Sequence, residues 1–268
     1  MGENRGNTGE AVEEVEDNAR ILQISLAPIA VELSRQPLRL NENRACSGKG
    51  RTACFGIVNT RRSVASGFAA HNIHRPHLYK MLLDFGVTHV PIQWNAIQVN
   101  QNYQCKKHRD SGNVGISFIV AFGTYAGGNL RVYQQTRYGE TATDYNIRHR
   151  PVTGIFSHFE HEVLPFTGDR FSLVYYKSTN LPLVIIGKCT MYTNLGVLLN
   201  AIDSYDDALD CHQKALAIAL ATSDCAGKHA ALLNLENTYT DLCMFDTAAI
   251  CRQALEENMR DEAGGGDA

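Results

Sequence analysis

The sequence predicts an α+β protein with a β-rich core of the antiparallel barrel or jelly-roll type, flanking helices, and a short all-α helical-repeat segment after it. Two observations predict this. Short apolar runs broken by glycine follow one another through the middle of the chain, which is typical of an antiparallel β fold. The C-terminal part instead repeats itself with a period near 40 residues, as paired helices of a solenoid do.

Length and composition fit this division. A chain of 268 residues with 44% hydrophobic residues can bury one substantial core and a small second unit. No apolar run is long enough to cross a bilayer, and the N-terminus lacks the apolar core of a signal peptide. We therefore expect an intracellular protein, nuclear or cytoplasmic, with no membrane partner. The eight scattered cysteines form no C-x-x-C pair, so we expect reduced thiols rather than a zinc ribbon.

The two ends are predicted to be less ordered than the rest. Residues 1–40 form a polar, partly disordered segment in which the apolar stretch 21–33 is a candidate helix. The glycine-rich stretch 261–268 is predicted to be a disordered tail.

The β-rich domain is predicted to span residues 41–188. A helix should begin at Pro76, because apolar residues recur every three or four positions as far as Phe85, and Gly86 should end it. Short β-rich runs follow it. These predicted strands are residues 96–103, 114–122, 130–133, 145–148, 154–156 and 171–176.

Residues 189–260 carry the repeat. Asn194 recurs as Asn234 and Tyr205 as Phe245, each after 40 residues. This segment resembles tetratricopeptide repeats of the kinesin-light-chain kind. The resemblance implies paired helices that bind a protein partner.

A pair of polar residues in the middle of the chain has the spacing of metal ligands. His108 and Asp110 are two residues apart, so on a strand their side chains share one face. His161 follows about 50 residues later and completes a set of two histidines and one carboxylate. Such a facial triad holds Fe(II) and leaves open positions for a 2-oxo acid and O2.

The same period of two places Arg170 and Ser172 on one face of a later strand and Phe171 on the other. A guanidinium can bind the distal carboxylate of 2-oxoglutarate through two parallel hydrogen bonds, with the hydroxyl of Ser172 as a further donor.

Together these motifs resemble the Fe(II)/2-oxoglutarate-dependent dioxygenase superfamily over residues 75–178, and are most similar to its TET/JBP branch. The resemblance implies a double-stranded β-helix (jelly roll) core with Fe(II), 2-oxoglutarate and O2 as cofactor and co-substrates. It also implies oxidation of a C–H bond, on a 5-methylpyrimidine-type nucleobase in this branch, with release of succinate and CO2. The residues that carry it are His108, Asp110, His161, Pro165, Phe166, Gly168, Arg170 and Ser172, with Asn113-x-Gly115-x-Ser117 and Gly127-Gly128.

Some positions near the motif have two interpretations. His158 competes with His161 for the third metal position, and the spacing to Arg170 favours His161. Otherwise His158 contacts the site indirectly or lies at the surface. Asn102, Tyr103 and Asn113 flank the metal pair, where they either contact the substrate or satisfy buried backbone groups.

Charge is segregated along the chain. Residues 41–188 hold 17 Lys and Arg against 8 Asp and Glu, whereas residues 189–268 hold 4 against 13. The basic segment either binds an anionic partner such as nucleic acid or is matched by the acidic part of the same chain.

The sequence leaves two alternatives to an enzyme that oxidises a nucleobase. One is a prolyl-type protein hydroxylase, and the other is a non-catalytic adaptor that binds a protein partner through its repeats.

Overall fold

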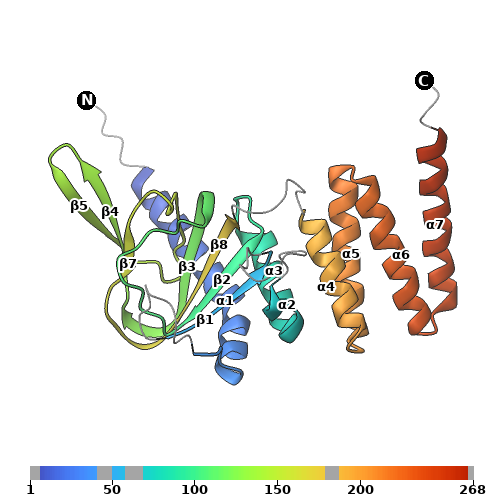
Figure 1. Cartoon of the computed structure of the whole chain (residues 1–268), viewed down its shortest axis with the longest axis horizontal. Helices are drawn as coiled ribbons and strands as arrows, with labels where there is room; N and C mark the ends of the chain where they lie inside the picture. Colours follow the sequence, from blue (N-terminus) through green and yellow to red (C-terminus); the bar gives the residue numbers. More distant parts are fainter. Residues whose placement is uncertain (1–6, 41–49, 58–68, 179–186, 265–268) are drawn as a thin grey trace. The chain divides into compact units, whose positions relative to one another are not determined.

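The computed structural model describes residues 7–40, 50–57, 69–178 and 187–264. The chain divides into two compact units (Figure 1). The first contains residues 1–69 and 84–181, and the second contains residues 70–83 and 182–268. Within the described ranges, no helix is both long and apolar enough to cross a membrane.

The first unit is built on two antiparallel sheets. A five-stranded sheet has the order β1-β2-β8-β3-β6, and a three-stranded sheet has the order β5-β4-β7. Two antiparallel sheets beside helices are consistent with the predicted jelly-roll α+β core. The strands are β1 (Arg51–Gly56), β2 (Ala96–Gln101), β3 (Asn113–Gly127), β4 (Leu130–Thr136), β5 (Gly139–Tyr145), β6 (Val152–Gly154), β7 (His161–Val163) and β8 (Phe166–Ser178).

Strand bounds differ from the predicted ones in a systematic way. β3 and β8 extend beyond their apolar runs, because backbone pairing between them continues from Asn113↔Ser178 to Gly127↔Phe166, with a shift in register near Val114. β5 was not predicted, since its residues are exposed and show no apolar alternation. The predicted strand 145–148 is wrong: β5 ends at Tyr145, and only an isolated bridge joins Arg148 to Ala121.

The large sheet has two different faces. Residues of β3 such as Ile119, Ala121 and Tyr125 point toward the small sheet and pack there against Leu130 and Phe156. On the opposite face, α1 (Asn7–Arg35) packs against β3. The helix is also tied to the end of β2, because the side-chain amide of Gln101 donates to the Leu33 carbonyl oxygen at 3.4 Å.

The predicted end of the helix at Gly86 is wrong. α3 (Pro76–His89) begins at Pro76 as predicted but continues through Gly86 to His89. A Cβ atom on Gly86 would lie 2.5 Å from the Trp94 ring and 2.6 Å from the Tyr175 ring. Glycine therefore serves here to let two aromatic rings approach the helix, and not to end it.

The second unit consists of helices. α2 (Ala70–His74) and the first turns of α3 belong to it, although residues 70–83 were predicted as part of the β domain. Lys80 forms an ion pair with Asp210, and His77 Nδ1 lies 3.1 Å from Asp207 Oδ2. The remaining helices are α4 (Lys188–Asn200), α5 (Tyr205–Thr222), α6 (Cys225–Asp241) and α7 (Phe245–Gly264).

These last four helices pack in chain order, α4 against α5, α5 against α6 and α6 against α7, and α4 also contacts α6. Small residues allow the close approach. Gly196 on α4 faces the ring of His212 on α5, and a Cβ atom there would lie 2.3 Å from that ring. Ala208 and Ala215 are fully buried.

Both predicted disordered ends contain helix in part. α1 starts at Asn7, well before the apolar stretch that predicted it, and α7 reaches Gly264. The rest of those predictions, on residues 1–6 and 265–268, lies outside the described residues.

Candidate active site

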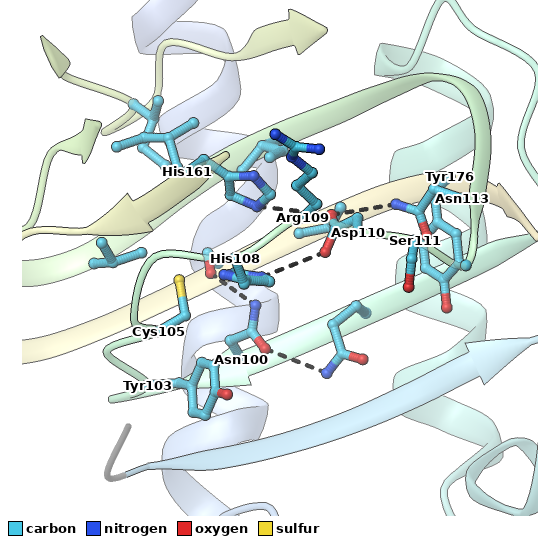
Figure 2. Close-up of a pocket in the computed structure, with 18 of the residues that line it drawn as sticks. Asn100, Tyr103, Cys105, His108, Arg109, Asp110, Ser111, Asn113, His161 and Tyr176 are labelled. Atoms are coloured by element: carbon cyan, nitrogen blue, oxygen red, sulfur yellow. Dashed lines mark hydrogen bonds and ion pairs between the residues drawn. The ribbon is translucent and has the colours of Figure 1, made fainter. Parts of the chain in front are cut away.

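A cavity of about 370 Å³ lies in the first unit. Its walls are formed by β2, β3, β4, β7 and β8, by the segment between β2 and β3, and by Ile147 between β5 and β6 (Figure 2). The lining side chains that can bind a ligand are Gln98, Asn100, Tyr103, Cys105, His108, Arg109, Asp110, Ser111, Asn113, His161, Arg170, Ser172 and Tyr176.

His108, Asp110 and His161 come together at this cavity. The Nε2 atoms of His108 and His161 lie 3.4 and 3.8 Å from the two oxygens of Asp110, and Figure 2 shows the three side chains converging. The possible ligand atoms all lie within 4.8 Å of one another. Adjacent ligands on a metal with bonds of about 2.1 Å are about 3 Å apart, so a small contraction would suffice for coordination.

Backbone hydrogen bonds fix the positions of these residues. The amides of His108 and His161 each donate to the carbonyl oxygen of the other, at 3.0 and 2.9 Å. The Asp110 amide donates to Phe156 O at 3.0 Å. The side-chain amide of Asn113 donates to Asp110 Oδ2 at 3.3 Å and to Ser117 Oγ at 3.2 Å. Asn113 therefore fixes the orientation of the Asp110 carboxylate.

Both imidazoles present the nitrogen that a metal needs. His108 Nδ1 lies 2.7 Å from Lys106 O, and His161 Nδ1 lies 3.2 Å from Phe159 O. A carbonyl oxygen only accepts, so each Nδ1 carries a proton and donates it, which leaves the lone pair of a neutral ring on Nε2. This is the arrangement of metal-ligating histidines, in which the outer nitrogen is oriented by a backbone carbonyl.

The electrostatics of the two histidines differ. Hydrogen bonding to Asp110, with a contribution from Cys105, raises the pKa of His108 to about 11. Burial lowers the pKa of His161, and the charge on Asp110 opposes that effect. Without a metal, His108 is therefore protonated beside the Asp110 carboxylate, and His161 is neutral. A metal that binds Nε2 of His108 would displace that proton and leave both rings neutral.

Arg170 is a buried cation whose guanidinium lacks a full set of acceptors. Its side chain is 1% exposed, and Nε and Nη2 meet no acceptor among the residues that the structure describes. The group lies 5.5 Å from the ring centroid of Tyr125 and 5.6 Å from that of Phe166. Burial lowers the pKa of Arg170. A Cβ atom on Gly128 would lie 3.0 Å from Arg170 Cδ and Nε, so the glycine leaves space for the side chain.

The other predicted residues divide into two groups. Tyr103 and Asn113 line the cavity, as does Ser172, which is 4% exposed. Asn102 does not line it: it accepts a hydrogen bond from the Arg170 amide at 2.7 Å and thereby joins the residue after β2 to β8. His158 is exposed and lies outside the cavity lining.

Sequence reasoning missed several lining residues. Gln98 and Asn100 lie on β2 and alternate there with the fully buried Ile97 and Val99. Polar side chains on alternate positions of an otherwise apolar core strand were the available signal. Cys105 is buried beside His108 and carried no comparable signal in the sequence.

No protein-family model and no curated protein matches this sequence. Solved structures of 2-oxoglutarate oxygenases are similar to it. A prolyl-4-hydroxylase from Pseudomonas putida is 15% identical, with a TM-score of 0.36, over 60% of this chain and 88% of that one. A 2OG-Fe(II) oxygenase-family oxidoreductase from Burkholderia pseudomallei is 17% identical, with a TM-score of 0.35, over 66% and 92%.

A third similar structure is NgTET1 in complex with 5mC DNA. It is 13% identical, with a TM-score of 0.35, over 61% of this chain and 68% of that one. Likeness at this level decides neither the fold nor the function of the chain.

Proposed function

We propose that this chain is an Fe(II)- and 2-oxoglutarate-dependent oxygenase. One observation carries the proposal: a His-Asp-His cluster and the buried, incompletely bonded guanidinium of Arg170 line the same cavity. A cavity with metal ligands and a buried cation suits a ligand that binds a metal at one end and carries an anion at the other. 2-Oxoglutarate has this chemistry.

His108, Asp110 and His161 would hold the metal. Two neutral imidazoles and one carboxylate form the donor set of non-haem Fe(II) oxygenases, whereas thiolate-rich sets favour zinc. Bound Fe(II) would supply the redox chemistry that couples decarboxylation of 2-oxoglutarate to oxidation of a C–H bond. The protein holds the ligand geometry through the paired backbones of the two histidines and the hydrogen bond from Asn113.

Arg170 and Ser172 would hold the distal carboxylate of 2-oxoglutarate. Nε and Nη2, which meet no acceptor within the described ranges, are parallel donors that a carboxylate can bridge. Because the guanidinium is buried, this ion pair forms where water competes little, and it also satisfies donors that otherwise stay without acceptors.

For the substrate we propose a nucleobase in nucleic acid, of the 5-methylpyrimidine type. Arg109 lines the cavity and is exposed, and Lys106 is exposed close by in sequence. Neither has an ion-pair partner among the described residues, whereas Lys107 is bound to Glu140. Unpaired cations beside a cavity suit phosphates that flank a bound base.

The helical unit is proposed to act as a tetratricopeptide-like appendage that binds a protein segment. Its helices pack in chain order, and the contact between α4 and α6 joins the equivalent helices of two successive pairs. That packing is what a solenoid of helical repeats requires.

The test is an anaerobic titration of metal-free protein with Fe(II) and 2-oxoglutarate. We expect a visible metal-to-ligand charge-transfer band in the wild type, absent in Asp110→Ala and Arg170→Met. No band in folded, iron-loaded protein would contradict the oxygenase proposal and leave the adaptor alternative. Succinate formation stimulated by methylated DNA or RNA would then support the nucleobase substrate, and stimulation by proline-containing peptides alone would contradict it.

A further inference from the structure

A chain of side-chain hydrogen bonds runs along the cavity wall to Ser172. The Gln98 amide donates to Asn100 Oδ1 at 3.2 Å, and the Asn100 amide donates to Ser172 Oγ at 3.2 Å. Figure 2 shows Asn100 with a dashed contact on each side. Asn100 lies directly opposite Ser172 in the pairing of β2 with β8, so this contact follows from the register of the sheet.

The donor-to-acceptor direction of these hydrogen bonds is set at Gln98. Gln98 Nε2 also donates to the carbonyl oxygen of Val99 at 3.3 Å, and the thiol of Cys54 donates to Gln98 Oε1 at 2.7 Å. A backbone carbonyl only accepts, so the NH2 group of Gln98 must face it. Asn100 then has to accept with Oδ1, and its own NH2 group must point to Ser172.

The consequence concerns the proton of Ser172. Its oxygen accepts from Asn100, so its O–H has to be donated to another group. No acceptor for that proton occurs among the described residues, and Ser172 lines the cavity that also contains the free donors of Arg170. The wall therefore presents only donors at this point, which matches a carboxylate and not a group that donates.

We propose that Asn100 is a positioning residue that holds the Ser172 hydroxyl as a donor to the distal carboxylate of 2-oxoglutarate. This inference rests on the proposed function. Asn100 acts through Ser172, and its amide is already bonded at both ends within the protein. It sets the preference of the cavity for a 2-oxo acid with a second carboxylate over one that lacks it.

The experiment is a double-mutant cycle on the Fe(II)-loaded protein. Dissociation constants are measured anaerobically from the charge-transfer band for wild type, Asn100→Ala, Ser172→Ala and the double variant. The ligands are 2-oxoglutarate and 2-oxobutyrate, which has the same 2-oxo acid head without the distal carboxylate. We expect Asn100→Ala to weaken 2-oxoglutarate roughly tenfold, the effect of one hydrogen bond to a charged group. Its effect on 2-oxobutyrate should be less than about twofold.

In the Ser172→Ala background, Asn100→Ala should have no further effect on 2-oxoglutarate, because the hydroxyl that it orients is absent. Asn100→Asp keeps the shape of the side chain and guards against a folding defect. Its carboxylate would accept the Ser172 proton, so it should weaken 2-oxoglutarate more than Asn100→Ala does. Asn113→Ala is the matched contrast, since its amide faces Asp110 and its loss should weaken Fe(II) binding instead.

Two results would overturn the positioning role while leaving the oxygenase proposal intact. One is that Asn100→Ala weakens the binding of 2-oxoglutarate and 2-oxobutyrate equally. The other is that Asn100→Ala weakens 2-oxoglutarate binding as much in the Ser172→Ala background as in the wild type. If the wild type forms no complex with 2-oxoglutarate, the proposed function fails and this inference fails with it.

Discussion

His108 and His161 exchange both of their backbone hydrogen bonds, so two residues from distant parts of the chain become cross-strand neighbours. Their ring centroids lie 4.4 Å apart, and both Nε2 atoms face Asp110. β7 is thereby paired on one side with β4 and bonded on the other to the segment that carries His108. The metal-ligand geometry depends on this short strand.

Loss of a metal ligand should be distinguishable from loss of its support. Asp110→Ala should abolish Fe(II) binding, and Asn113→Ala should weaken it about tenfold or more, as removal of an outer partner of a metal ligand does. Anaerobic calorimetry with Fe(II) measures both. His158→Ala is the control and should bind iron like the wild type, because His158 is exposed and outside the cavity lining. Loss of iron binding in His158→Ala would show that the third ligand is misassigned.

Arg170→Met should separate stability from binding. Arg170 Nε and Nη2 are buried and meet no acceptor in the described part of the chain, which costs free energy in the ligand-free protein. Methionine removes that cost at similar volume. We expect the free energy of unfolding of the ligand-free protein to rise by about 1–3 kcal/mol, while 2-oxoglutarate binding is lost. Denaturant unfolding and the charge-transfer titration measure the two effects. A strongly destabilised variant would indicate that Arg170 has a structural partner.

Gly86→Ala should destabilise the protein although alanine is the better helix former. The added methyl would meet the rings of Trp94 and Tyr175 within 2.6 Å or less, and overpacking costs about 1–3 kcal/mol. Thermal unfolding measures the change. Val87→Ala, on the same helix at a more exposed position, is the control and should change stability by less than about 0.5 kcal/mol. Increased stability of Gly86→Ala would mean that the aromatic rings move aside at little cost.

His212 should make the helical unit sensitive to acid. Burial lowers its pKa from 6.5 to about 4, and Nδ1 has no hydrogen-bond partner among the residues that the structure describes. Between these two pH values the unfolded chain binds more protons than the folded one, so stability is complete above pH 6.5 and falls as the pH decreases toward 4. The slope should be at most about 1.4 kcal/mol per pH unit.

The measurement compares unfolding of wild type and His212→Phe over this pH range, so that titrations common to both cancel. The difference in stability should shift in favour of the variant as the pH falls. An unchanged difference would show that His212 is protonated in the folded protein.

The sequence by itself determined which residues share a face of a strand. The period of two put Arg170 with Ser172 and apart from Phe171, and the structure places the first pair on the cavity wall and Phe171 in a stack with Phe122. It also marked the start of α3 at Pro76 and the separate helical character of the C-terminal part. These features depend on local geometry, in which neighbouring residues fix the direction of each side chain.

Only the tertiary structure decided which residues from distant segments become neighbours. It brought His161 to Asp110 and left His158 exposed, and it placed Asn100 opposite Ser172. It also assigned residues 70–83 to the helical unit, where Lys80 forms an ion pair with Asp210 of α5. Such relations depend on the register between strands and on packing between distant segments, and a change of one residue in register reverses every side chain. No pattern within a short stretch of sequence contains that information.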